Sequence, residues 1–305
     1  MPTPRAARRI ARKQNRSNPT PAAPRIESIP RTSMVLSDVI HAASWEMQPT
    51  RPGNYLHVSD LLGKCIRKRA LNHRLGLVEP ARKLTLSDLL TFAQGDAIHD
   101  LLKDRARRGA PDRVWGNWSC KCKALYHETP CTYAEIDQEE ECPHCHTKVD
   151  QYHEVSMFDE DLWIVGNPDL LLYLAELDAI HITELKSIAP DQFKELARPK
   201  PDHVLQVVFY WYLMNKLGYN LTDKVSIFYA TKGWMFGSQK PYKEFVIHPQ
   251  LELHRLEDMI EDARAHKAAY LDEKAPLPVR TLCASPAAKE AKTCSVCDVC
   301  FAGGK

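Results

Sequence analysis

The sequence predicts an α/β protein, because segments with strand character and segments with helical spacing alternate along its 305 residues. The clearest strand pattern is residues 164–187, where two apolar, β-rich arms flank the polar break Glu176-Leu177-Asp178, which is suited to a hairpin turn. Further strands are predicted at 224–233 and 242–249, and helices at 58–77, 87–109, 205–219 and 251–274. A sheet with helices packed against it accommodates all of these segments.

The predicted hairpin carries a candidate catalytic group. Glu184 and Lys186 are two residues apart on a strand, so they point the same way while Leu185 points into the core. Asp169, on the neighbouring strand, can converge on them. Two carboxylates are oxygen ligands for a hard cation such as Mg²⁺, and a nearby lysine can orient or deprotonate a water and offset charge on a phosphate. The alternative is a surface hairpin with a salt bridge.

The helix predicted at 58–77 has Ser59 as its candidate N-cap. A lone cysteine such as Cys65 is usually a small buried side chain. It becomes a candidate ligand here because other cysteines need a fourth partner.

The helix predicted at 87–109 has a broad apolar face and Ser87 as its candidate N-cap. Gly95 in its middle costs stability and therefore predicts the close approach of another backbone. His99 follows one turn later. It is either a structural histidine or, if this helix lies beside the hairpin, a third metal ligand.

The apolar helix predicted at 205–219 places Gln206 and Tyr210 on one face, because they are four residues apart. An amide and a phenol together can meet a phosphate or a base edge, and the alternative is a helix buried in the core. Glu154, ahead of the hairpin, is an acid that would extend the metal site.

Ten cysteines in a chain without a visible export signal indicate metal binding rather than disulfides. Cys120, Cys122, Cys142 and Cys145 form two short knuckles, as in a zinc ribbon, within residues 115–150. Such a segment has little apolar content and depends on metal for its fold. The possible substitutes among the ligands are Cys131, His127, His144 and His146.

A second cysteine group closes the chain at residues 283–300. Cys294, Cys297 and Cys300 form two overlapping C-x-x-C steps, which suit iron–sulfur chemistry or zinc. With Cys65 they make four ligands, and Cys283 is the alternative to Cys297.

Composition adds the remaining expectations. The formal net charge is only +2, but residues 1–31 hold eight Arg or Lys and one acid, so we expect a disordered basic arm at 1–33 that attracts phosphate backbones. The folded part is expected to begin near Met34. No apolar run approaches the ~20 residues of a membrane helix and no signal peptide is visible, which predicts a cytoplasmic protein without a membrane partner.

The order of these motifs resembles the PD-(D/E)XK nuclease superfamily, specifically its RecB-type branch. The matching elements are the G-x-x-x-H helix (Gly95 to His99), the G-x-P-D strand (Gly166 to Asp169), the E-x-K strand (Glu184 to Lys186) and the Q-x-x-x-Y helix (Gln206 to Tyr210). Cys65 with the terminal cysteines looks like the iron–sulfur subgroup, which includes CRISPR-associated 5′→3′ exonucleases and related phage recombination nucleases.

The resemblance covers about residues 55–300 without the ribbon and implies a central mixed sheet flanked by helices. We expect the nuclease domain to span residues 34–305, interrupted at 115–150 by the zinc-ribbon-like insert. It implies that Asp169, Glu184, the Leu185 carbonyl and His99 hold Mg²⁺ or Mn²⁺, and that Lys186 positions the attacking water. Gln206 and Tyr210 would guide the DNA strand. A 4Fe-4S cluster on Cys65, Cys294, Cys297 and Cys300 would join the two ends of the nuclease domain.

These features together predict a metal-dependent deoxyribonuclease, acting as a 5′→3′ exonuclease on single-stranded ends in recombination or end processing, with DNA and a recombination protein as partners. One alternative is a non-catalytic DNA-binding or assembly module on the same fold. The other is a restriction-type endonuclease. The sequence leaves the polarity, the oligomeric state and the role of the insert open.

Overall fold

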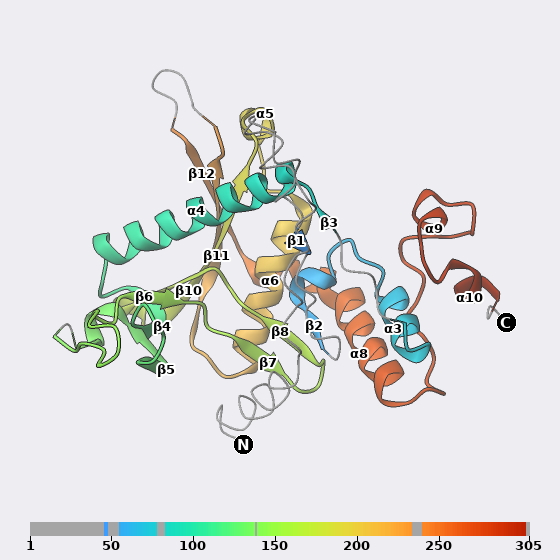
Figure 1. The fold of residues 1–305 in the computed structure, drawn as a ribbon, viewed down its shortest axis with the longest axis horizontal. Coiled ribbons are helices and arrows are strands. Elements are labelled where there is room, and N and C mark those ends of the chain that lie inside the picture. Colours follow the sequence, from blue (N-terminus) through green and yellow to red (C-terminus); the bar gives the residue numbers. More distant parts are fainter. Residues whose placement is uncertain (1–45, 48–54, 78–82, 138, 234–239, 303–305) are drawn as a thin grey trace, which may run out of the picture.

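The computed structural model describes residues 46–47, 55–77, 83–137, 139–233 and 240–302. The expected basic arm at 1–33 and the expected start of the fold near Met34 lie outside these residues. In the described part, a mixed seven-stranded sheet forms the centre, in the order β12-β11-β10-β9-β4-β5, with β6 also paired to β4 (Figure 1). Its strands are β4 (Val114–Ser119), β5 (Tyr126–Thr132), β6 (Gln151–His153), β9 (Leu170–Leu174), β10 (Ala179–Ile188), β11 (Leu221–Thr231) and β12 (Tyr242–Ile247). This arrangement confirms the predicted α/β class with a central mixed sheet.

The predicted hairpin is formed by β9 and β10, which are antiparallel with Leu174 opposite Ala179. A short 3₁₀ turn, η4 (Ala175–Leu177), joins them, and Asp178 follows it in the left-handed region with φ 46°. The polar break at 176–178 therefore makes the turn that its composition predicts. β10 then pairs in parallel with β11, the one parallel pair among the described strands of this sheet.

The first arm of residues 164–187 is not one strand. Residues Ile164–Gly166 form β8, which belongs to a three-stranded sheet with β2 (Leu56–His57) and β7 (Met157–Asp159). The central sheet resumes only at β9. Pro168 lies between β8 and β9, and it has no N–H to donate to a ladder, so the chain changes sheets there. A further small sheet pairs β1 (Glu46–Met47) with β3 (Lys83–Leu84).

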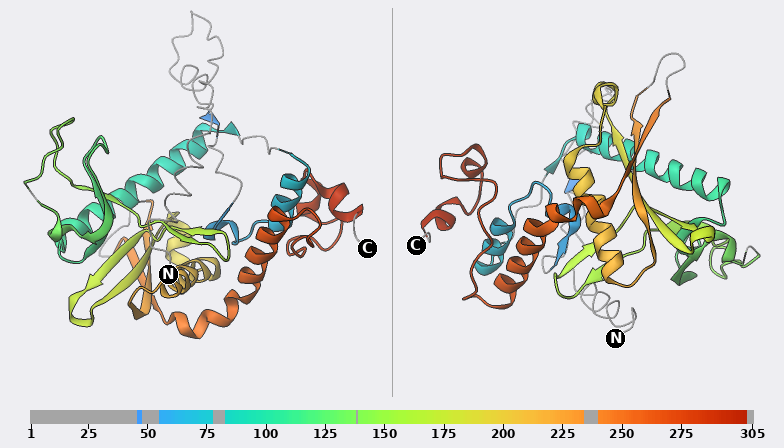
Figure 2. Two further views of the ribbon diagram at one scale, coloured as in Figure 1. Left: turned by 90° about the horizontal axis from the view of Figure 1, so that it is seen from below. Right: turned by 180° about the vertical axis from the view of Figure 1, so that it is seen from behind.

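Helices flank the central sheet on both sides. α6 (Pro201–Lys216) packs against β10 and β11, and its side chains are buried along most of its length from Val204 to Met214. α4 (Leu86–Gly109) lies on the other side of these strands (Figure 2). A Cβ at Gly95 of α4 would lie 3.3 Å from Ser187 Oγ of β10 and 3.6 Å from Lys232 Nζ. Gly95 thus makes room for side chains, rather than for a backbone as predicted.

The broad apolar face predicted for α4 is not covered by other described residues. No side chain of this helix is buried in the structure, and Leu90, Phe92 and Leu101 are 62%, 44% and 54% exposed. Apolar spacing reports which residues share a helix face, but it does not report whether a partner covers that face.

The two expected N-caps are also wrong. Thr85, not Ser87, caps α4, and it forms a reciprocal capping box with Asp88. Ser59 lies in a 3₁₀ turn, η2 (Val58–Asp60), while α3 (Ile66–Arg74) begins after Cys65, whose sulfur accepts the Lys68 N–H. A capping side chain satisfies free N–H groups in the first turn, and several polar residues near a helix start can do so.

The C-terminal part packs on α3. The helix predicted at 251–274 is divided into α7 (Pro249–Glu252), the 3₁₀ turn η5 (Leu253–Leu256) and α8 (Glu257–Leu271). α8 packs along α3, where the rings of His73 and Tyr270 stack with centroids 3.7 Å apart. The short helices α9 (Lys289–Lys292) and α10 (Cys297–Ala302) lie beyond α3, away from the central sheet (Figure 1). The remaining described helices are α5 (Pro190–Glu195) and the 3₁₀ turn η3 (Tyr133–Glu135).

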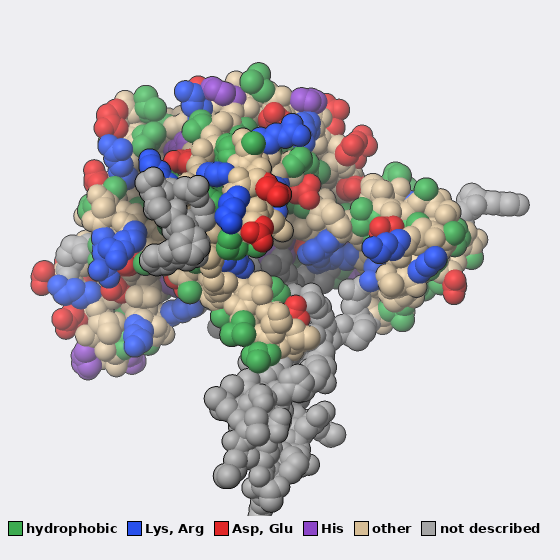
Figure 3. Space-filling model, turned by 90° about the horizontal axis from the view of Figure 1, so that it is seen from above, with side chains coloured by type: hydrophobic (Ala, Val, Ile, Leu, Met, Phe, Trp, Pro, Cys, Tyr) green, Lys and Arg blue, Asp and Glu red, His purple; other side chains and the backbone are tan. Residues whose placement is uncertain are grey.

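The surface is mixed in charge. On the face shown in Figure 3, Lys and Arg side chains are interspersed with Asp and Glu. None of the described helices is both long and apolar enough to cross a lipid bilayer.

Candidate active site and cysteine sites

The structure brings Asp169 to the strand that carries Glu184 and Lys186. Asp169 directly precedes β9, and its Oδ2 accepts a 2.8 Å hydrogen bond from the Leu185 N–H of β10. The amide and carbonyl of a strand residue point to the same edge, so the Leu185 carbonyl also faces the side on which Asp169 lies. The pairing of β9 with β10 ends at Leu170 opposite Thr183, so no backbone group of the described residues pairs with Leu185 at this edge, and the Asp169 carboxylate takes that place.

Glu184 is an acid held almost entirely out of water. The residue is 1% exposed, its Oε1 accepts a hydrogen bond from Lys186 Nζ, and its Oε2 is buried with no hydrogen-bond partner. Burial, and then the Asp169 carboxylate, raise the pKa of Glu184 to about 8. Burial opposes the charge of Lys186, but Glu184 and Asp169 outweigh it and raise the pKa of that ammonium group.

α4 delivers His99 and Lys103 to the same region. Burial lowers the pKa of His99, the Asp169 carboxylate opposes this shift, and the Lys103 and Lys186 ammonium groups add to it. Lys103 Nζ lies 2.7 Å from Glu154 Oε1. Burial raises the pKa of Glu154, with a further contribution from Asp169. The Asp169 carboxylate therefore affects the pKa of both His99 and Glu154.

α6 contributes the two residues predicted to share a face. Gln206 Nε2 donates a 2.9 Å hydrogen bond to the Tyr210 hydroxyl, and both side chains are buried. Burial and the Glu184 carboxylate raise the pKa of Tyr210 well above its ordinary value. Gly166 permits the contact of β8 with α6, because a Cβ there would lie 3.1 Å from Cδ1 of both Tyr210 and Leu213.

Two residues that the sequence analysis does not single out lie beside Lys186. Tyr229 of β11 is the register partner of Lys186 and is fully buried. Its hydroxyl accepts a 3.1 Å hydrogen bond from the Lys200 N–H and lies 2.8 Å from His203 Nδ1. The available sequence signal is that His203 is three residues before Gln206, and hence on the same face of α6.

The four predicted zinc-ribbon cysteines come together. The sulfur atoms of Cys120, Cys122, Cys142 and Cys145 all lie within 4.8 Å of one another, so this group could hold a metal ion. Among the described residues, no other set of three or more His, Cys, Asp or Glu side chains meets this distance, so His99, Asp169 and Glu184 are not all this close. The possible substitutes Cys131, His127, His144 and His146 lie outside the group, and His127 instead contacts Glu140 at 2.9 Å.

The two knuckles have matching backbone geometry. The Cys120 N–H bonds the Leu125 carbonyl and the Cys142 N–H bonds the Thr147 carbonyl, each at 3.0 Å. Each turn includes a residue in the left-handed region, Lys123 (φ 62°) in the first and His146 (φ 53°) in the second. Backbone N–H groups also point at the sulfur atoms of Cys120 and Cys142 at 3.4 Å.

The predicted insert at 115–150 begins inside the central sheet. Residues 115–119 belong to β4, and Trp115 pairs with Leu171 of β9. The knuckles therefore extend from an edge of the sheet rather than from a separate linker.

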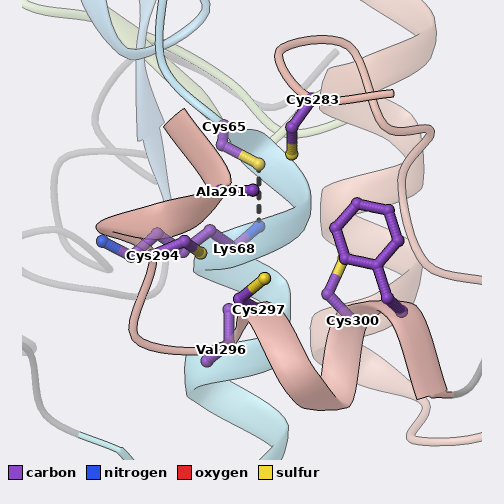
Figure 4. Close-up of a pocket in the computed structure, with 9 residues that line it drawn as sticks. Cys65, Lys68, Cys283, Ala291, Cys294, Val296, Cys297 and Cys300 are labelled. Carbon is purple, nitrogen blue, oxygen red and sulfur yellow. Dashed lines mark hydrogen bonds between the residues drawn. The ribbon is translucent and has the colours of Figure 1, made fainter. Parts of the chain in front are cut away.

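The five cysteines considered as cluster ligands line one cavity between α3 and the C-terminal helices (Figure 4). They are Cys65 at the start of α3, Cys283, Cys294, Cys297 and Cys300. Arg67 Nε donates to the sulfur of Cys300 at 3.2 Å. Burial raises the pKa of the Cys65 thiol. The structure thus brings Cys65 to the terminal group together with both alternatives, Cys283 and Cys297.

No protein-family model matches this chain, and no curated protein matches it. Among solved structures, the chain is similar to one described as the crystal structure of SSO0001, at 15% identity and a TM-score of 0.34, over 70% of this chain and 78% of that one. It is also similar to an alkaline exonuclease (LHK-Exo) from Laribacter hongkongensis, at 13% identity and a TM-score of 0.33, over 72% of this chain and 95% of that one. TM-scores this low do not establish a relationship.

Proposed function

We propose that this protein is a metal-dependent deoxyribonuclease, a 5′→3′ exonuclease that hydrolyses phosphodiester bonds at single-stranded DNA ends during recombination or end processing. The observation that carries the proposal is the buried Glu184 carboxylate, whose Oε2 lacks a partner, beside Asp169 and Lys186. A buried, unsatisfied carboxylate oxygen next to a second acid is costly unless a cation binds there.

The residues present fit a divalent cation. Glu184 Oε2 is a buried acceptor without a hydrogen-bond partner. The Asp169 carboxylate is held by the N–H of Leu185, and the Leu185 carbonyl faces the same edge of the strand. These are the oxygen donors that Mg²⁺ or Mn²⁺ takes, with His99 as a further ligand. When bound, such a cation supplies Lewis acidity to a phosphate oxygen and to a water.

The side chains around this site have complementary roles. Lys186, freed from Glu184 Oε1, orients the attacking water and offsets the negative charge that develops on the phosphate. Gln206 and Tyr210 present an amide and a phenol from α6, where they guide the DNA strand. In phage-type recombination this reaction would process DNA ends for a recombination protein.

The two cysteine sites complete the proposed organisation. Residues 34–305 form the nuclease domain, the ribbon-like insert at 115–150 holds Zn²⁺ through four thiolates, and the 283–300 segment holds a 4Fe-4S cluster. The cluster ligands are Cys65, Cys294, Cys297 and Cys300, with Cys283 as the alternate to Cys297. The cluster joins α3 to the end of the chain.

The decisive test is a nuclease assay on end-labelled single- and double-stranded linear DNA with Mn²⁺. The wild type should release label from one end, and the Lys186→Ala variant should be inactive. Lys194→Ala, an exposed lysine on α5, is the matched control and should keep full activity. The identity of the released end gives the polarity, and discrete internal fragments would indicate the endonuclease instead.

Metal analysis separates the remaining possibilities. Anaerobically purified protein should contain both zinc and iron, and protein without iron would remove the cluster from the proposal. If protein with both metals binds DNA but cleaves none of the substrates, the chain is the non-catalytic binding module.

A further inference from the structure

One face of α6 runs along the strand that carries the candidate catalytic residues. His203, Gln206 and Tyr210 are spaced i, i+3 and i+7, so they form one stripe of about 10 Å on this helix. At one end of the stripe, burial and then the Glu184 carboxylate raise the pKa of Tyr210. At the other end, His203 contacts Tyr229, the register partner of Lys186. His203 is therefore placed at the lysine end of the site.

The hydrogen bonds of Tyr229 fix the protonation of His203. The buried Tyr229 hydroxyl already accepts the Lys200 N–H at 3.1 Å, and its own proton needs an acceptor. His203 Nδ1, at 2.8 Å, is the acceptor that the described residues offer. Were Nδ1 protonated instead, the hydroxyl would accept twice and its proton would be buried without a partner, which is costly. Nδ1 thus accepts, and Nε2 carries the ring proton.

Stacking on Tyr229 also fixes the position of the His203 ring. The His203 and Tyr229 rings stack with centroids 5.5 Å apart and an interplanar angle of 29°. Burial, with the Lys186 charge nearby, lowers the pKa of His203 to about 4, so the ring is neutral at physiological pH.

The Nε2–H group of His203 is available to a ligand. No hydrogen-bond partner for it occurs there, and it is not among the buried unpartnered atoms, so it reaches solvent from a half-buried ring. A fixed donor that points outward beside Lys186 is suited to an anionic oxygen.

We propose that His203 binds a non-bridging phosphate oxygen of the DNA strand through Nε2–H, and that Tyr229 is the positioning residue that holds the ring in this tautomer. The phosphate is the one held at the Lys186 end of the α6 stripe. This inference rests on the proposed nuclease function, since it assigns the strand to the same site.

The test measures DNA binding rather than cleavage. A labelled single-stranded oligonucleotide is bound in EDTA, and a series of otherwise identical oligonucleotides carries one uncharged methylphosphonate linkage at successive positions. The wild type should lose about 10- to 100-fold in affinity at one linkage, the effect of a hydrogen bond to a charged group. His203→Phe should bind unmodified DNA more weakly by a similar factor and should lose its sensitivity at that linkage alone.

A second variant tests whether the weaker binding of His203→Phe reflects only a disturbed structure. His203→Gln retains an N–H donor, so it should keep the sensitive linkage with at most a few-fold loss of affinity. In cleavage with Mn²⁺, His203→Phe should raise KM about tenfold while kcat stays within a few-fold.

Two results would overturn the inference: a wild-type profile that is flat across all linkages, or a His203→Phe profile identical to the wild type. Cleavage of unmodified DNA by the wild type, lost in Lys186→Ala, is scored in parallel. If cleavage holds and the profiles fail, only the role of His203 is wrong, whereas absent cleavage removes the nuclease proposal itself.

Discussion

Replacing Glu184 by Gln should stabilise the metal-free protein at neutral pH, although it removes a proposed metal ligand. The pKa of this acid rises from 4.5 to about 8 on folding. A group with a raised folded-state pKa favours folding fully below its unfolded pKa, and this contribution is lost as the pH rises through the folded pKa. Its window is therefore pH 4.5 to 8, and stability falls across it.

The magnitude follows from the same shift. At pH 7 the unfolded acid is ionised while the folded one is largely protonated, and at 1.36 kcal/mol per pH unit this costs roughly 3 kcal/mol. Gln has the shape of the protonated acid and does not titrate. Part of the gain is lost with the Lys186 contact, so we expect Glu184→Gln to add about 1–3 kcal/mol to the free energy of unfolding at pH 7.

Urea unfolding in EDTA measures this difference at pH 7 and pH 5. The gain should shrink below about 1 kcal/mol at pH 5, because this pH lies only about half a unit above the unfolded pKa of 4.5. The control is Glu195→Gln, an exposed acid on α5, which should change stability by less than about 0.5 kcal/mol at both pH values. A variant that is no more stable than the wild type at pH 7, or whose gain is equal at pH 5, would refute the reasoning.

Other replacements test separate parts of the structure. Cys142→Ser should abolish zinc binding, measured as metal content per chain, while Cys131→Ser, outside the thiol group, should keep it. Gly166→Ala should cost about 1–3 kcal/mol in urea unfolding because its Cβ would meet α6 side chains at 3.1 Å, whereas Gly109→Ala, with open space around it, should be nearly neutral. Leu90→Ala on the exposed face of α4 should change the unfolding free energy by less than about 0.5 kcal/mol, and a larger loss would show that something covers this face.

Local patterns predict the parts of the molecule that depend on neighbours in the sequence. The turn at Glu176-Leu177-Asp178, the strands β11 and β12, and the shared face of Gln206 and Tyr210 follow from period and turn composition. These features do not depend on which distant segments pack against them.

What the sequence does not predict are contacts between distant segments. The pairing of His203 with Tyr229 joins residues 26 apart, and no periodicity marks it. The exposure of α4 likewise depends on what lies over the helix. Pro168 marks the interruption between β8 and β9 in the sequence. That these two strands belong to different sheets depends on β2, which pairs with β8 and lies more than a hundred residues earlier.

The one parallel pair of the described central sheet also bears on the order in which the site assembles. Asp169 and Glu184 meet through a hairpin, whereas the parallel β10–β11 pair requires residues 189–220 to cross over, and this crossover carries α6. We expect the hairpin to form first, because it closes the shorter loop. The burial that raises the pKa of Glu184 would then oppose the later docking of α6 rather than the formation of the hairpin.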